Sequence, residues 1–145
     1  MKLGGLDQLK SLSIDVGSVF VMTLYGSDGI TPKDGEESRR KMFVVLGKNK
    51  TSFTVASVLI NSDINAHKFN MIGPYQHEIR GDAYDFLSKD VSYVDGYVLF
   101  EFPISRIQDN AEYLGLISEE DLKQIIAHVK ESPAIQPRLI SQYNL

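Results

Sequence analysis

Two groups of polar side chains have the types and spacing that a phosphate-binding site requires. They are the basic triplet Arg39, Arg40 and Lys41, and the pair Asn61 and Ser62. The triplet precedes the apolar run of residues 42–46, and the pair ends the apolar run that begins at residue 55. Cationic side chains form charge-assisted hydrogen bonds with phosphate oxygens, and amide and hydroxyl groups add further donors. If the two runs are neighbouring antiparallel strands, both groups lie at the same rim, where we expect Arg40 and Ser62 to share an anion.

Two histidines and an acidic loop are the candidates for proton transfer beside that phosphate. Histidine changes its charge near neutral pH, so His67 and His77 are candidate substrate-binding residues that carry protons. The polar loop of residues 26–38 holds Asp28, Asp34, Glu36 and Glu37. These acids either act as a general base or hold the arginines in place when no ligand is bound. The alternative is a solvated hairpin loop without a role in binding.

Short runs rich in β-branched and aromatic residues predict a mainly β protein. The expected strands cover residues 17–25, 38–47, 55–62, 75–79, 91–94 and 97–102, the last with an extension to residue 107. The runs at 42–46 and 55–60 do not alternate between apolar and polar residues, so both of their faces should be buried, as in a small barrel. The turn of residues 47–50 joins these two strands, with Asn49 in the left-handed conformation.

The best helix signal lies near the C-terminus, at residues 118–131. Ser118 is placed to cap it, three acids follow in the first turn, and Pro133 ends it. Its apolar residues recur with helical spacing and form one stripe. Weaker signals predict a short helix opened by Asp82 and a lead-in with leucines at every third position from Leu3 to Leu12. The expected organisation is a single domain: lead-in 1–16, SH3-like barrel 17–108, helix 118–131 and a docked tail 132–145.

Composition excludes several classes of function. The net charge of −4 gives no overall attraction to nucleic acid, so an anion site must be local. The chain has no cysteine, which fits the cytoplasm, and no run long enough to span a membrane. Its three histidines, at positions 67, 77 and 128, lack metal-ligand spacing, and we expect neither a metal nor a cofactor.

The order of these segments resembles the PemK/MazF-type toxin family. The sequence Gly17-Ser18-Val19-Phe20-Val21 is followed by a polar loop, Arg39-Arg40-Lys41, an apolar strand, Leu59-Ile60-Asn61-Ser62, Tyr75-Gln76-His77-Glu78-Ile79 and Tyr97-Val98-Leu99-Phe100. Family members begin with a similar strand, place an arginine-rich segment before the second strand, and end the third on a Pro-Ile-Thr-Ser-like sequence. Lys41 and Leu59 stand here where the family usually has proline.

The resemblance implies a metal-independent endoribonuclease that cleaves single-stranded RNA by attack of the ribose 2′-hydroxyl. It also implies a homodimer that is neutralised by an antitoxin protein. Arg40 or Lys41 takes the role of the family arginine, and Ser62 that of the threonine or serine at the strand end. Arg39, Lys41 and Asn61 would then contact the RNA. The alternative is a non-catalytic barrel that binds protein or nucleic acid, such as a divergent relative, phage- or defence-related, that has lost the nuclease activity.

Overall fold

The computed structural model describes residues 14–31 and 37–145, so the leucines expected to form a lead-in lie outside the described residues. Seven strands form one antiparallel sheet: β1 (Ser18–Tyr25), β2 (Ser38–Asn49), β3 (Thr54–Asn61), β4 (Gln76–Arg80), β5 (Val91–Asp95), β6 (Phe100–Pro103) and β7 (Glu112–Leu116). The α-helices are α2 (Phe69–Ile72), α3 (Ile104–Asn110), α4 (Glu119–Glu131) and α5 (Pro137–Gln142), and the 3-10 turns are η1 (Gly26–Asp28), η2 (Ala66–Lys68) and η3 (Gly73–Tyr75).

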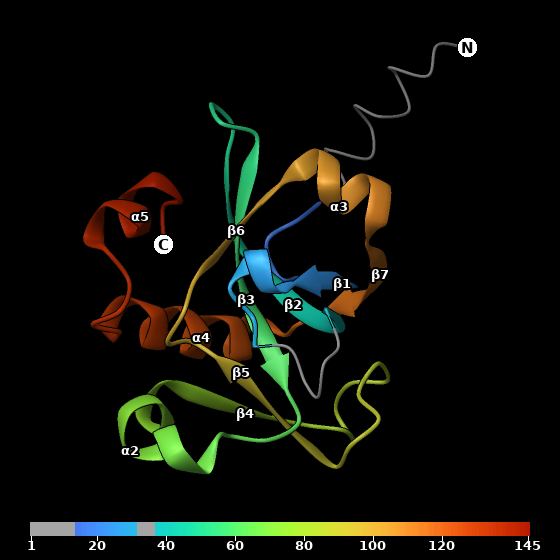
Figure 1. The fold of residues 1–145 in the computed structure, drawn as a ribbon, viewed down its shortest axis with the longest axis vertical. Coiled ribbons are helices and arrows are strands. Elements are labelled where there is room, and N and C mark those ends of the chain that lie inside the picture. The colour runs from blue at the N-terminus through green and yellow to red at the C-terminus, as the bar shows by residue number, and fades with distance from the viewer. Residues whose placement is uncertain (1–13, 32–36) are drawn as a thin grey trace.

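The long strands β2 and β3 form the centre of the sheet. The strand order is β4-β5-β3-β2-β1-β7, and β6 pairs with the first half of β3 while β5 pairs with its end. The sheet curls into a half-barrel, with the β2–β3 hairpin projecting from it (Figure 1). The expected mainly β, barrel-like fold with a C-terminal amphipathic helix is confirmed.

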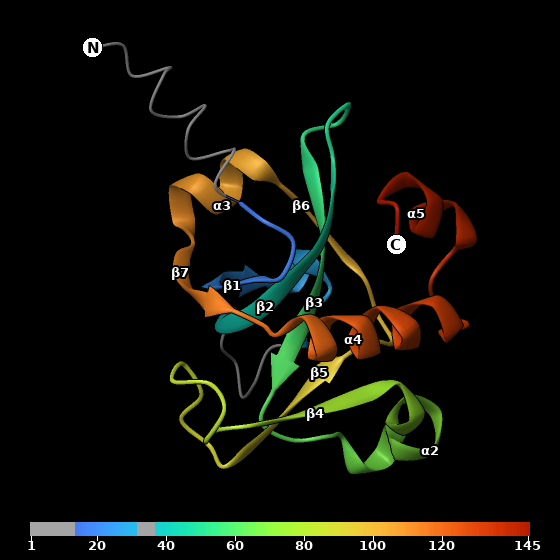
Figure 2. The same ribbon diagram turned by 180° about the vertical axis from the view of Figure 1, so that it is seen from behind.

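Two apolar clusters cover the two faces of the central strands. Phe43 and Val45 of β2 join the cluster inside the curl, which α3 completes with Ile104 and Ile107. Val44 belongs to the second cluster, on the outer face, which α4 covers. Burial of consecutive residues on both faces explains why the sequence of β2 does not alternate. Figure 2 shows α4 lying across this outer face.

The C-terminal elements follow the sequence prediction. The Ser118 hydroxyl accepts a hydrogen bond from the amide of Asp121 and caps α4, as expected. Ile125 and Val129 of the predicted stripe are fully buried against the sheet. The tail packs against the sheet, where Ile135 and Tyr143 are 7% and 3% exposed.

Four local predictions require correction. Residues 81–87 form turns and not the helix that Asp82 was expected to open, and residues 104–107 begin α3 and do not extend a strand. The sheet includes β7, beyond the expected barrel boundary at residue 108, and that strand was not predicted. Asn49 ends β2, and its side chain accepts hydrogen bonds from the amides of Thr51 and Ser52. The left-handed residue of this turn is Phe53, with a φ of 55°.

Candidate functional site

The register of β2 and β3 brings the two polar groups of the sequence together. Met42 pairs with Ile60, so Lys41 and Asn61 come next, on opposite strands. The Lys41 Nζ donates a hydrogen bond to the Asn61 Oδ1, and both side chains are partly buried. The expected juxtaposition of the triplet with the end of β3 is therefore present for Lys41 and Asn61.

Arg40 is separated from this contact by the pleat of the strand. Successive side chains of a strand point to opposite faces, so Arg39 and Lys41 share one face and Arg40 lies on the other. The Arg40 guanidinium lies 3.8 Å from the Glu112 carboxylate of β7, and both side chains are more than half exposed. The structure does not bring Arg40 to Ser62, which corrects the expectation that the two residues share an anion.

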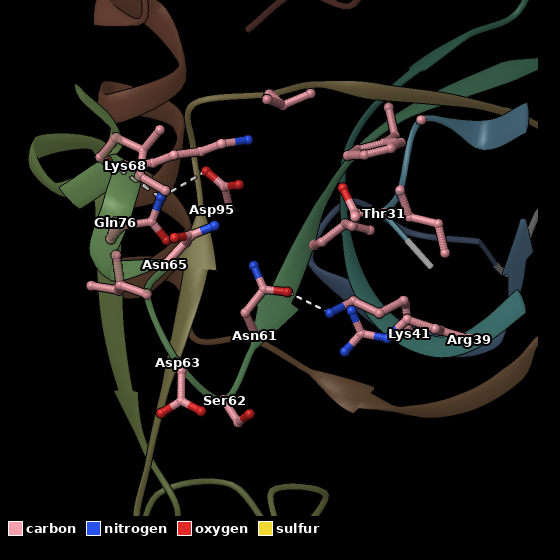
Figure 3. Close-up of a pocket in the computed structure, with 17 residues that line it drawn as sticks. Thr31, Arg39, Lys41, Asn61, Ser62, Asp63, Asn65, Lys68, Gln76 and Asp95 are labelled. Atoms are coloured by element: carbon pink, nitrogen blue, oxygen red, sulfur yellow. Dashed lines mark hydrogen bonds between the residues drawn. The ribbon is translucent and has the colours of Figure 1, made fainter. Parts of the chain in front are cut away.

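A pocket of about 390 Å³ opens where β2 and β3 reach the rim. Arg39, Lys41, Asn61 and Ser62 line it, so four of the five rim candidates surround one cavity. Its volume lies within the usual range of small-molecule sites, about 300–1,000 Å³. Figure 3 shows Arg39 and Lys41 on one side of this pocket and Asn61 between the two sides. This side carries the cations and can bind an anion.

The opposite wall consists of residues that sequence reasoning missed. Gln76 and Asp95 pair across β4 and β5, and the Gln76 Nε2 donates to the Asp95 Oδ1 at 2.7 Å and to the Ile72 carbonyl at 3.3 Å. Asn65 and Lys68 complete this wall (Figure 3). Residues 75–79 were predicted as a strand, but no sequence signal gave the register of β4 against β5.

The two predicted histidines lie outside the pocket lining. His67 is exposed in η2, where its backbone amide donates to the Asn65 side chain. His77 faces α4, on the other side of β4 from Gln76, and its Nε2 lies 2.8 Å from the Asp121 Oδ1. Neither histidine lines the pocket with Arg39 and Lys41.

His77 belongs to a separate polar cluster between β4, α4 and the turn of residues 81–87. The Tyr84 hydroxyl donates to Asp121 and accepts from the Ser118 amide. Burial raises the pKa of Asp121, but hydrogen bonds from Tyr84, His77 and Ser118 outweigh it and lower that pKa overall. Burial, together with repulsion from His77, lowers the pKa of His128. This cluster fixes α4 on the sheet.

Asp28, at the start of the loop of residues 26–38, pairs with Arg106, which lies outside the basic triplet. Arg106 of α3 forms two hydrogen bonds with the Asp28 carboxylate, at 2.6 and 2.8 Å. The hydrogen bond from Arg106 lowers the pKa of Asp28. Asp28 thus anchors η1 to α3 and does not hold Arg39, Arg40 or Lys41. Asp34 and Glu36 lie outside the described residues.

Within residues 14–31 and 37–145, no group of three or more His, Asp or Glu side chains is arranged to hold a metal ion. In the same ranges, no helix has the length and apolar character needed to cross a membrane.

The architecture is a small, curled antiparallel sheet with helices packed on its faces. The chain is similar to one in the crystal structure of MazE-MazF (Form-III) from Deinococcus radiodurans, with a TM-score of 0.54 and 14% identity over 79% of this chain and 91% of that chain. The fold is therefore MazF-like. No protein-family model and no curated protein matches the sequence.

Proposed function

We propose that this protein is a MazF-like toxin that binds and cleaves single-stranded RNA in the pocket at the end of β2 and β3. The observation that carries the proposal is the hydrogen-bonded pair of Lys41 and Asn61, with Arg39 beside it, in a protein of MazF-like fold. Lys41 and Arg39 take the cationic role that the family resemblance implies for Arg40 or Lys41, and Ser62 positions a phosphate oxygen.

The proposed chemistry needs no metal ion. The ribose 2′-hydroxyl attacks the adjacent phosphorus and loses its proton to water, and the bond from phosphorus to the 5′-oxygen breaks. The leaving 5′-oxygen takes up a proton from water, so the products carry a 2′,3′-cyclic phosphate and a 5′-hydroxyl. Negative charge grows on the phosphoryl oxygens in the transition state. Arg39 and Lys41 stabilise this charge, and removal of one such contact costs about 3–4 kcal/mol.

The test is cleavage of a single-stranded RNA in the presence of a chelator. Wild type should cut the RNA and should not cut the same oligonucleotide with 2′-deoxyribose. Lys41→Met should reduce the rate by two orders of magnitude or more, whereas Lys48→Met, at the other end of β2, should keep wild-type activity. An RNA that stays intact with wild type contradicts the nuclease proposal.

A second candidate function is RNA binding without cleavage. The placement of both histidines outside the pocket lining favours it, since they were the candidate proton carriers. Expression in a growing culture distinguishes the two functions: a nuclease stops growth, and a binding protein does not. Binding of the RNA with no cleavage and no growth arrest would support this second function.

The similar structure contains MazE together with MazF, which supports a protein partner of the antitoxin type for this chain. The family resemblance of the sequence adds a homodimer and action in the cytoplasm to the proposal. The edge strand β7 offers a surface for a second copy, because Tyr113 and Leu116 are 54% and 56% exposed. Apolar exposure on an unpaired edge favours strand association. Light scattering should give the dimer mass for wild type and the monomer mass for Leu116→Glu; a monomeric wild type contradicts the dimer.

A further inference from the structure

Gln76 and Asp95, on the pocket wall opposite Arg39 and Lys41, present hydrogen-bond acceptors, whereas Asn65 and Lys68 of the same wall carry donors. Asp95 uses one carboxylate oxygen, Oδ1, to accept from the Gln76 side chain and from the Tyr97 amide at 3.0 Å. Its second oxygen, Oδ2, makes no hydrogen bond or ion pair with any residue of the described ranges. Because Asp95 lines the pocket, this oxygen is available to a ligand there.

The orientation of the Gln76 amide is fixed by its neighbours. Both partners of its nitrogen, the Ile72 carbonyl and the Asp95 carboxylate, are acceptors, so the NH₂ group must face them. Both amide hydrogens are thereby used, and Oε1 remains as an acceptor. Gln76 and Asp95 therefore offer this pocket two acceptor oxygens and no donor.

We infer that this wall reads a guanine base of the bound RNA through its Watson–Crick edge. The inference rests on the proposed RNA binding in the same pocket. Guanine is the one common base whose Watson–Crick edge carries adjacent donors, N1–H and the N2 amino group, and the Asp95 carboxylate and Gln76 Oε1 accept from them. Adenine, cytosine and uracil each place an acceptor beside their donor, and that acceptor meets an oxygen of the wall.

The rest of the pocket fits the same ligand. Leu59, Val98 and Phe100 supply apolar and aromatic surface, on which a base packs when it leaves its stack. Arg39 and Lys41 lie on the far side of the cavity from Gln76 and Asp95 (Figure 3). A nucleotide spanning the pocket would place its phosphate on the cations and its base on the acceptors.

Asp95→Asn tests the inference without removing the scaffold. The Asn oxygen can accept both bonds that Asp95 Oδ1 accepts now, while the second oxygen becomes an NH₂ donor. Asp63→Asn is the matched control, since Asp63 lines the same pocket and loses the same charge. Melting curves of both variants check that they are folded.

The experiment measures binding of uridine decamers that carry one central guanosine, inosine or adenosine, with 2′-O-methyl riboses so that no cleavage occurs. We expect wild type to bind the guanosine decamer about tenfold more tightly than the adenosine decamer. Inosine, which lacks the N2 amino group, should fall between them. Asp95→Asn should abolish the preference, and Asp63→Asn should retain it while binding all three decamers more tightly.

Four outcomes would overturn the inference. Equal binding of the three decamers by wild type rejects guanine recognition and leaves RNA binding standing. A guanosine preference that survives in Asp95→Asn places recognition elsewhere. If guanosine monophosphate displaces the guanosine decamer at lower concentration than unlabelled decamer does, the pocket serves a free nucleotide. Absence of binding by every decamer rejects the proposed function as well.

Discussion

Lys41 and Asn61 stand opposite each other at the ends of β2 and β3, and the Lys41 Nζ donates a hydrogen bond to the Asn61 Oδ1. This contact joins the basic triplet to the polar end of β3. The pleat of β2 decides which arginine accompanies Lys41 in the pocket. Arg39 lies on the same face of the strand as Lys41, and Arg40 lies on the opposite face.

Arg39 and Arg40 should differ in the salt dependence of RNA binding, although they are neighbours of the same type. Each phosphate contact that is lost reduces the slope of log K against log salt by about 0.7 for single strands. Arg39→Gln should lower the slope by about this amount and weaken binding. Arg40→Gln should leave the slope within error, because Arg40 faces Glu112. Titrations at several salt concentrations measure both, and a larger loss in Arg40→Gln would contradict the assigned site.

Asp28→Asn should destabilise the fold by about 1–3 kcal/mol, since charge-assisted hydrogen bonds to a partly buried arginine are lost. The side chains of Asp28 and Arg106 are 14% and 26% exposed. The matched control is Asp82→Asn, whose ion pair with Arg80 is 75% exposed at the carboxylate and should contribute within about 0.5 kcal/mol. Urea denaturation measures both variants, and equal stabilities would refute an anchoring role for Asp28.

The pair of Asp28 and Arg106 should also make the free energy of unfolding fall in acid. The hydrogen bond from Arg106 lowers the pKa of Asp28 in the folded state. The contribution of the pair to the free energy of unfolding is therefore complete above the pKa that an aspartate has in the unfolded chain, about 4. It is lost as the pH falls from there through the lowered folded value. Asp28→Asn should therefore flatten the decline of stability below about pH 4.

His128 should make the free energy of unfolding fall as the pH drops through about 6.5, the ordinary pKa of histidine. Burial and the neighbouring His77 lower its pKa in the folded state, although Glu131 opposes this. The unfolded chain thus binds the proton more readily, and stability is lost below the unfolded value. Denaturation between pH 5 and 8 should show a smaller slope for His128→Gln.

His67→Gln is the control for the substitution itself, because it replaces the same residue type at an exposed position. The hydrogen bond of His67 in η2 uses its backbone amide, and its side chain is exposed. We expect the stability of the variant to stay within about 0.5 kcal/mol of wild type. An unchanged slope in His128→Gln would show that another group causes the dependence.

The sequence predicted the elements whose signals are local. The apolar runs of β2 and β3, the Ser118 cap and the stripe of α4 each follow from propensity, periodicity or capping within a few residues. The short strand β7 was missed, because residues 112–116 hold two exposed large side chains and Gly115, whose φ of 157° suits an irregular edge.

The candidate site was predicted only in part, because it depends on register and pleat. The triplet and the end of β3 were identified, but the sequence did not show that Arg40 turns away or that Gln76 and Asp95 pair. The partners in both cases come from strands distant in the sequence. The pleat of β2 puts Arg40 on the face opposite Arg39 and Lys41, and only the pairing with β3 showed which face holds the pocket.

Gly47→Ala should disturb the docking of the C-terminal tail on the sheet. Gly47 follows an irregularity in the pairing of β2 with β3, and a Cβ there would lie 2.6 Å from the Tyr143 carbonyl oxygen and 3.0 Å from its Cβ. Backbone atoms cannot yield as a flexible side chain does, so the overpacking should cost about 1–3 kcal/mol. Urea denaturation and the rate of tryptic cleavage after the exposed Arg138 measure the effect.

Gly73→Ala is the control for Gly47→Ala. A Cβ at Gly73 would meet the ring of Phe69 at 3.5 Å, an ordinary contact, and the backbone there is already helical. Gly73 precedes Pro74, which disfavours the helical conformation for a residue with a Cβ and offsets the entropic gain of alanine, so the variant should stay within about 1 kcal/mol of wild type. Gly47→Ala should in contrast expose the tail, because the hydrogen bonds of the Tyr143 hydroxyl with Thr54 and Glu101 require the ring to stay in place. Equal stability and equal tryptic cleavage of the two variants would show that the tail does not depend on close packing against β2.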